Sequence, residues 1–169
     1  MHRQTELIPI NNPMSNKIPL SKVQVQLIEE LVQVHVMMGL QPAWGKILAL
    51  LTVSDETELT FEQIMETLDI SKSGVSQALK QLELTKRIAY RTKMNDRKRY
   101  FHLRIEDWRE QVAEMFSVLG KSVATTNKIL KIRPAATKAF NRDLADMNNF
   151  LSSLHKMTIP ALKTTPDKK

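Results

Sequence analysis

Two short helical patterns joined by about three residues constrain the fold of this chain most strongly. The first opens on a capping box, Thr60 with Gln63, and the second opens on an N-cap residue, Ser71. Their apolar positions at helical spacing are Phe61, Ile64, Met65 and Leu68, then Val75, Leu79 and Leu82. Two helices of two to three turns with so short a connection predict a helix-turn-helix unit.

The hydrophobic period changes after Lys86. Apolar and polar residues alternate in residues 87–93, residues 99–104 are again rich in strand formers, and Asn95 and Asp96 between them suit a turn. The sequence therefore predicts a two-stranded β-hairpin with a basic tip directly behind the helix-turn-helix, in the position of a wing.

The rest of the chain has helical periodicity. One amphipathic helix starts near Leu20 and ends at Gly39, and a second starts at Pro42. The apolar positions of the first are Leu20, Val23, Leu27, Leu31, Val34 and Met38, and those of the second are Trp44, Ile47, Leu48 and Leu51. Residues 55–58 suit a polar turn. We therefore expect a mostly α fold with a small β-hairpin wing.

Long helices are also predicted in the last third. Before a break at Pro134, the apolar positions are Trp108, Val112, Met115, Phe116, Leu119 and Val123. Beyond Pro134, apolar residues recur at intervals of four and three positions, and such a stripe needs a partner helix to cover it. Its residues are Phe140, Leu144, Met147, Leu151 and Leu154.

Four segments are expected along the chain. Residues 1–19 have no periodicity and suit a flexible arm, residues 20–104 form the winged helix-turn-helix domain, residues 105–159 form C-terminal dimerisation helices, and residues 160–169 suit a disordered tail.

Positive charge is concentrated in one fifth of the chain. The formal net charge is +7, and residues 71–104 hold ten Lys or Arg against two acids, whereas the remainder holds fifteen basic and sixteen acidic residues. A localised surplus of this kind is typical of a surface that binds a polyanion. Residues 53–70 carry six acids and no Lys or Arg, which suits a solvated face that a polyanion would repel.

The helix that follows Ser71 has no acid before Glu83 on its polar face. For an isolated helix, a solvated surface is the simplest interpretation. In this context Ser, Lys and Gln side chains favour DNA, because they bind phosphate oxygens or base edges in the major groove. The residues of this face are Ser71, Lys72, Ser73, Ser76, Gln77, Lys80 and Gln81. Gly74 permits a close approach of either the preceding helix or a DNA backbone.

The hairpin tip offers a second set of cations, which could also be no more than a solvated basic turn. It carries Lys93, Arg97, Lys98 and Arg99. Such a tip can follow the DNA backbone with an Arg in a narrow minor groove, and we expect Arg97 to be that residue. Asp96 would be unfavourable beside phosphates unless it pairs with a neighbouring Arg.

Other classes of function find little support in the sequence. Cysteine is absent, which excludes disulfides and thiolate metal sites. The four histidines are scattered, and no phosphate-binding, dinucleotide-binding or nucleophile motif is present. We expect neither enzymatic activity nor a catalytic residue, metal or cofactor, and without a signal peptide or a long apolar stretch we expect a soluble cytoplasmic protein.

Three stretches resemble the MarR superfamily of bacterial winged-helix regulators, and more narrowly its branch of choline-responsive repressors of glycine-betaine synthesis. They are GLQPAWGKILALL at 39–51, ISKSGVSQALKQLE at 70–83 and NDRKRYFHL at 95–103. The resemblance covers residues 20–104 well and the C-terminal helices only in general character. It favours a repressor that binds double-stranded DNA as a homodimer on a pseudo-palindromic operator. A winged-helix module that binds an acidic protein partner remains the alternative.

The resemblance also implies roles for individual residues. The recognition helix would contact DNA through Ser71, Lys72, Ser73, Ser76, Gln77 and Lys80. The wing would contact it through Arg91, Lys93, Asn95, Arg97, Lys98 and Arg99. The first and last helices would form the dimer through Leu27, Leu31, Phe140, Leu144, Met147, Leu151 and Leu154. An effector of unknown identity is also implied. A quaternary ammonium ligand would need an aromatic cage, for which the candidate residues are Trp44, Trp108 and Phe116, although all three also suit a core.

Overall fold

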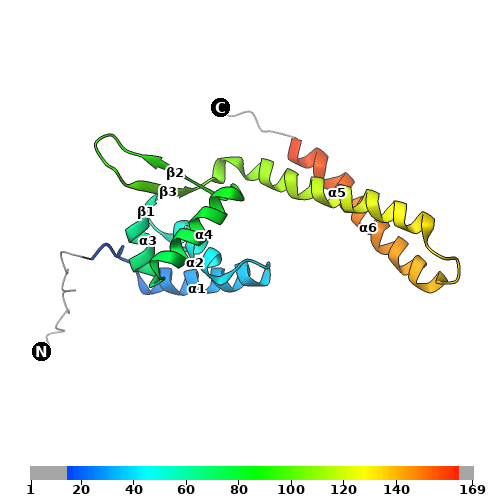
Figure 1. Ribbon diagram of the computed structural model, residues 1–169, viewed down its shortest axis with the longest axis horizontal. Helices are drawn as coiled ribbons and strands as arrows, with labels where there is room; N and C mark the ends of the chain where they lie inside the picture. Colours follow the sequence, from blue (N-terminus) through cyan, green and yellow to red (C-terminus); the bar gives the residue numbers. More distant parts are fainter. Residues whose placement is uncertain (1–14, 164–169) are drawn as a thin grey trace, which may run out of the picture. The chain divides into compact units, whose positions relative to one another are not determined.

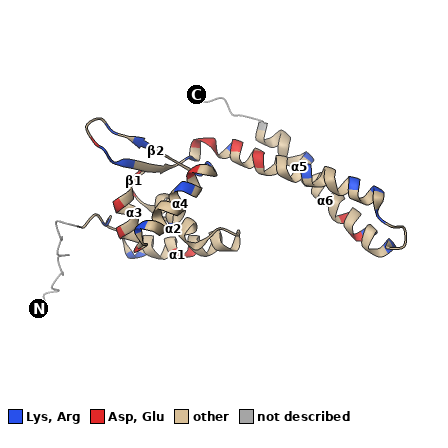
Figure 2. Cartoon of the chain, viewed as in Figure 1, with Lys and Arg blue, Asp and Glu red and all other residues tan. Residues whose placement is uncertain are grey.

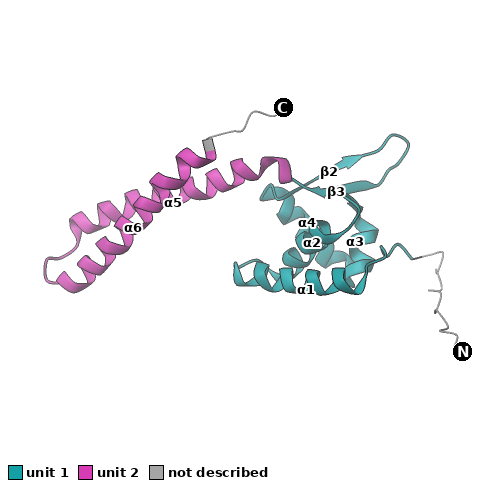
Figure 3. Ribbon diagram, turned by 180° about the vertical axis from the view of Figure 1, so that it is seen from behind, with its two compact units in different colours: residues 1–104 teal, residues 105–169 magenta. Residues whose placement is uncertain are grey.

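The chain folds into two compact units, residues 1–104 and 105–169 (Figure 3). The computed structural model describes residues 15–163, with the side chain of Lys163 left out. The first unit has the order α1 (Lys22–Met37), α2 (Pro42–Val53), β1 (Leu59–Thr60), α3 (Phe61–Leu68), α4 (Lys72–Leu84), β2 (Ile88–Thr92) and β3 (Arg99–Leu103). The second has a 3₁₀ turn (Ile105–Asp107), α5 (Trp108–Ile132) and α6 (Lys138–Lys163).

Helix α2 forms the centre of the first unit (Figure 1). Pro42 stands in its first turn, as predicted, and Ile47 and Leu50 are fully buried. The neighbouring α1 starts at a capping box made by Ser21 and Gln24. Its helical character is confirmed, but its buried residues are Ile28 and Val32 rather than members of the predicted stripe.

The predicted stripe of α1 stays largely on its outer side. Val23 is 66% exposed, Leu27 46% and Val34 48%, while Leu31 is half-buried against the core. The spacing of apolar residues in α1 fits more than one helical face, and contact with α2 selects the face that contains Ile28 and Val32. Most of the predicted stripe is therefore left without a partner in residues 15–163.

The helix-turn-helix forms as predicted from α3 and α4. The Thr60 hydroxyl accepts a hydrogen bond from the Gln63 backbone N–H, and the Gln63 side chain accepts one from the Thr60 backbone N–H. Asp69 ends α3 in the left-handed conformation, with φ of 51°. The Ser71 hydroxyl then caps α4 by accepting from the Gly74 N–H at 3.2 Å. Val75, Leu79 and Leu82 are buried, so the predicted inner face of α4 is confirmed.

The wing belongs to a three-stranded antiparallel sheet of order β1-β3-β2. The predicted hairpin of β2 and β3 is confirmed, with Tyr90 opposite Phe101 and Arg91 opposite Tyr100. Strand β1 was not predicted, because two residues are too few to show alternation; the 55–58 turn runs directly into it. Leu59 pairs with Phe101 there and is fully buried, which attaches the wing to the core.

Residues 15–19, which were predicted to belong to a flexible arm, are attached to α3. The backbone N–H and the side-chain amide of Asn16 each donate to the Glu66 carboxylate at 2.6 Å. The Ile18 N–H donates to the Thr67 hydroxyl at 3.1 Å, and the Ile18 side chain is buried. These contacts cannot be inferred from the local composition, because their partners lie about fifty residues away. Residues 1–14 of the predicted arm lie outside the described part.

In the second unit, α5 and α6 lie side by side as a helical hairpin (Figure 1). The chain breaks at Pro134, as predicted. Asn141 stabilises the turn, because its side-chain oxygen accepts from Arg133 Nε at 2.6 Å and its amide donates to the Pro134 carbonyl at 3.0 Å. Helix α6 continues through Pro160 to Lys163, beyond the predicted start of the tail at residue 160. Residues 164–169 lie outside the described part.

The predicted apolar stripe of α6 faces α5 only in part. Leu144 and Leu151 are half-buried, whereas Phe140 is 55% exposed, Met147 52% and Leu154 38%. The buried side chain of α6 is Asn148, whose amide donates to the Asn127 side chain at 2.9 Å and to the Val123 carbonyl at 3.3 Å. A single neighbouring helix therefore covers one edge of the stripe and leaves the other edge exposed.

Candidate nucleic-acid interface

Helix α4 separates an apolar inner face from a polar outer face. Four of its residues are buried: Val75, Ala78, Leu79 and Leu82. All six predicted recognition residues are exposed: Ser71, Lys72, Ser73, Ser76, Gln77 and Lys80. Within residues 15–163, no ion pair holds Lys72 or Lys80. The cations and amides of this face are thus available to an external partner.

The start of α4 has internal roles that limit what Ser71 and Gly74 offer to a ligand. Ser71 Oγ is the helix cap and lies 3.3 Å from Ser73 Oγ. A side chain at Gly74 would meet the Ile70 side chain at 3.0 Å and Ser71 Oγ at 3.1 Å. A β-carbon at Gly74 would thus crowd two neighbouring side chains, which is a reason for a glycine here that involves no DNA.

The tip of the wing presents two uncommitted cations. Arg97 and Lys98 are exposed, and the side chains of both are without an ion pair in the part of the chain that the structure describes. Asn95 adopts a φ of 64°, a turn conformation that Asn tolerates better than most residues. We conclude that Asn95 shapes the turn, whereas Arg97 and Lys98 supply its free positive charge.

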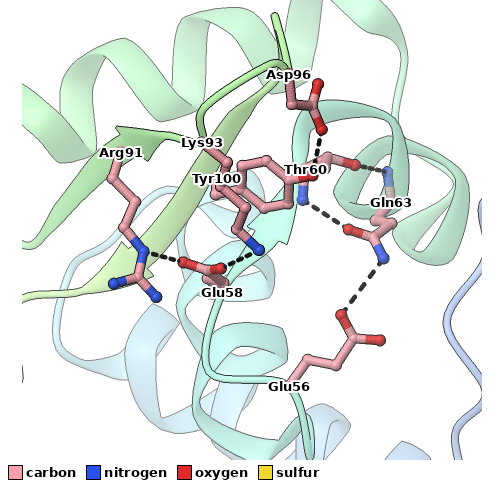
Figure 4. Close-up of polar contacts among 8 residues, drawn as sticks. All are labelled: Glu56, Glu58, Thr60, Gln63, Arg91, Lys93, Asp96 and Tyr100. Carbon is pink, nitrogen blue, oxygen red and sulfur yellow. Dashed lines mark hydrogen bonds and ion pairs between the residues drawn. The ribbon is translucent and has the colours of Figure 1, made fainter.

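Two other predicted wing contacts are engaged inside the molecule (Figure 4). Arg91 Nε pairs with one oxygen of Glu58, and Lys93 Nζ lies 2.5 Å from the other oxygen. The hydrogen bond from Arg91, followed by that from Lys93, lowers the pKa of Glu58 below its ordinary value, and the same contact raises the pKa of Arg91. Sequence reasoning overlooked this role of Glu58 because the residue is thirty-three positions from Arg91.

Among residues 15–163, Asp96 bonds to Tyr100 and to the tip backbone and pairs with no arginine, the partner that would have suited it beside phosphates. Its carboxylate accepts a 2.6 Å hydrogen bond from the Tyr100 hydroxyl and a 2.9 Å bond from the Lys98 backbone N–H. The Tyr100 bond is the largest cause of the lowered pKa of Asp96, and it also raises the pKa of Tyr100. Asp96 therefore fixes the path of the tip backbone rather than the direction of a guanidinium group.

Arg99 lies on the face of the hairpin opposite to that of Tyr100, the next residue of β3. Its guanidinium carbon is 4.5 Å from the centre of the Tyr90 ring, a cation–π geometry. Tyr90 in turn contacts Phe101, with ring centres 5.9 Å apart. Arg99 remains exposed, but its side chain is stacked within the hairpin.

The acidic stretch before α4 is more than a solvated face. Besides Glu58 and Glu66, Asp55 accepts from the Gln24 side chain at 3.1 Å and Glu56 from the Gln63 side chain at 3.4 Å. Figure 2 shows the acids of α3 beside the Lys and Arg of α4 and the hairpin. Four of the six acids thus connect parts of the first unit to one another.

The predicted dimer residues lie in both units and are not tested by a single chain. Leu27 is exposed on α1 and Leu31 is half-buried there. On α6, exposed apolar side chains beyond the predicted stripe include Phe150 at 67% and Met157 at 73%.

The predicted effector residues are divided between the units. Trp44 is half-buried beside the first core, and it is not among the residues that line two cavities of about 620 and 560 Å³ in the described part of that unit. Trp108 is 46% exposed with the Arg109 guanidinium carbon 4.7 Å from its ring, and Phe116 is half-buried on α5. The effector site stays a prediction.

Comparison with known proteins identifies the fold. A solved structure described as a transcriptional regulator matches 83% of this chain and 95% of its own, with 21% identity and a TM-score of 0.65. MepR, a transcription regulator of the Staphylococcus aureus multidrug efflux pump MepA, matches over 78% of this chain and 93% of its own, with 19% identity and a TM-score of 0.40. No family model and no curated protein matches the sequence. The predicted fold class, mostly α with a winged helix-turn-helix, is confirmed.

Two further features of the described residues concern other kinds of site. Between residues 15 and 163, no helix is both long and apolar enough to span a membrane. In the same range, no group of three or more His, Asp or Glu residues is placed to hold a metal ion.

Proposed function

We propose that this protein is a sequence-specific transcription regulator, a non-enzymatic member of the MarR superfamily that binds double-stranded DNA. The outer face of α4 carries this proposal, because six exposed Ser, Lys and Gln residues lie opposite a buried apolar face that fixes their direction. Such a helix can enter the major groove with its polar side chains toward base edges. The free cations at the wing tip, Arg97 and Lys98, suit the adjacent backbone or minor groove.

The finer parts of the proposal concern assembly and regulation. We infer a homodimer that represses from a pseudo-palindromic operator, since the exposed apolar residues of α1 and α6 need a partner and two copies would supply two recognition helices. An effector would act by changing the spacing of those helices. The narrower choline-responsive branch rests only on the resemblance of the sequence.

Selection of bound duplexes from a random library, with and without cellular metabolites, tests the proposal directly. We expect an enriched site with two-fold symmetry, and an affinity that falls steeply with salt, since each neutralised phosphate contributes about −0.9 to the slope of log K against log salt. A flat salt response with no enriched sequence would contradict DNA binding and would favour a protein-binding winged helix. Sedimentation of the protein with the selected duplex gives the number of copies bound.

A further inference from the structure

One acidic residue outside the hairpin connects the two edges of the wing sheet. Glu58 directly precedes β1, and its side chain is only 12% exposed because Arg91 and Lys93 cover it. The strand order is β1-β3-β2, so a bridge from Glu58 to Arg91 joins one edge strand to the other across β3 (Figure 4). The bridge adds a side-chain connection to the hydrogen bonds of the ladder.

The bridge continues toward the tip through Tyr100. This residue of β3 is opposite Thr60 on one side and Arg91 on the other, so all three side chains share one face of the sheet. Lys93 Nζ lies 3.8 Å from the centre of the Tyr100 ring, and the Tyr100 hydroxyl donates to Asp96. A continuous series of contacts therefore runs from Glu58 through Lys93 and Tyr100 to the turn.

This series ends beside the cation that we expect to reach DNA. Arg97 follows Asp96 in the chain, and its own side chain is exposed. A two-stranded ribbon is only marginally ordered by itself, and ordering it on binding would cost affinity. Contacts that hold the ribbon in one position before DNA arrives remove part of that cost.

We propose that Glu58 is a positioning residue of the DNA interface. Its bridge to Arg91 and Lys93 fixes the wing so that Arg97 reaches DNA, and loss of the Glu58 carboxylate weakens DNA binding although it removes a negative charge. This inference rests on the proposed DNA-binding function. A purely Coulombic role predicts the opposite sign, because removing the acid frees two cations and steepens the salt slope by up to about 1.8.

The test compares full-length variants on one selected duplex over a salt series, with affinity read by fluorescence anisotropy. E58Q keeps the size of the side chain and E58A removes it, while both delete the same charge. We expect E58A to bind about tenfold more weakly than the unaltered protein, a change in affinity that matches the interaction energies measured between neighbouring residues. The affinity of E58Q should lie between those of E58A and the unaltered protein. E62Q serves as the control, since it removes a charge from α3 at a residue for which the described part shows no hydrogen bond or ion pair.

A double-mutant cycle separates positioning from general destabilisation. If Glu58 acts through the tip, E58A changes affinity little when Arg97 is already replaced by alanine, whereas a general loss of folding persists in the R97A background. Tighter binding by E58A with a steeper salt slope overturns the inference, and so does an equal loss in both backgrounds. A flat salt response of the unaltered protein instead overturns the proposed function itself.

Discussion

Helix α4 and the wing were both predicted to bind DNA, yet they present their polar side chains in different ways. On α4, all six predicted residues are exposed, and the side chains of Lys72 and Lys80 make no ion pair within residues 15–163. On the wing, Arg91 and Lys93 are bound to Glu58, and Arg99 is stacked on Tyr90. The wing cations without an internal partner in the described part of the chain are therefore Arg97 and Lys98, at the tip.

The difference shows that some polar side chains of the first unit are free to bind a partner, whereas others stabilise the fold. A helix is stabilised by its own backbone hydrogen bonds and its buried face, so its outer side chains need no internal partner. A short hairpin packs only part of its surface against the core, here through Ile88 and Phe101, and its own charged and aromatic side chains hold the shape of the rest. The presence of a Lys or Arg in a wing is therefore not sufficient to predict that it contacts DNA.

The largest expected effect comes from altering the buried face of α4, because that face holds the exposed residues of the helix in place. Leu82 is fully buried, and we expect Leu82→Ala to lower the free energy of unfolding by about 2–5 kcal/mol through the lost burial and the cavity left behind. Denaturant unfolding measures this change. Lys80→Ala on the outer face is the matched control, with a change within about 0.5 kcal/mol. Equal effects of the two variants would show that the inner face does not hold α4.

Replacing a base-reading residue of α4 should affect sequence preference. We expect Gln77→Ala to cost about 1–3 kcal/mol on the selected site, because an amide on the exposed face loses its hydrogen bonds to a base edge. Competition between the selected duplex and single-base variants measures the change. Preference should relax at one or two positions while binding to random DNA is nearly unchanged. A uniform loss on all sequences would assign Gln77 to the backbone instead.

The two classes of wing cation should separate in their salt dependence. We expect Arg97→Ala to weaken binding across many sequences and to reduce the salt slope by about 0.9, the value for one phosphate contact. Arg91→Ala should change the slope less, because Arg91 is paired with Glu58. Anisotropy titrations at several salt concentrations measure both slopes. An Arg97→Ala effect confined to one base pair would indicate direct readout by Arg97.

The smallest expected effect is a pH dependence of the wing. The pKa of Glu58 is lowered from 4.5 in the folded state, so its contribution to stability is present above pH 4.5 and is lost as the pH falls through the folded-state pKa. The difference in thermal stability between the unaltered protein and Glu58→Gln should therefore shrink below pH 4.5. Thermal melts from pH 7 to 3 measure it, and a difference that grows on acidification would contradict the bridge.

Most of the first unit could be predicted where the signal is local. The capping box at Thr60, the N-cap at Ser71 and the buried positions of α4 follow from neighbouring residues, and all are present. The hairpin and its turn at Asn95 were likewise readable from alternation and turn chemistry. The docking of residues 15–19 on α3 was missed, because it depends on hydrogen bonds to Glu66 and Thr67 far along the chain.

The sequence by itself determined the helix-turn-helix and the hairpin, though not the short strand β1, and it determined that the positive charge is concentrated between residues 71 and 104. It also determined which side chains α4 exposes, since one helical period orders both faces. Only the tertiary structure decided which cations remain free. Pairing of Glu58 with Arg91 and Lys93 requires the residue before β1 to meet β2 and the residue after it across β3, although Glu58 and Arg91 are 33 positions apart in the chain. Local periodicity carries no information about such partners.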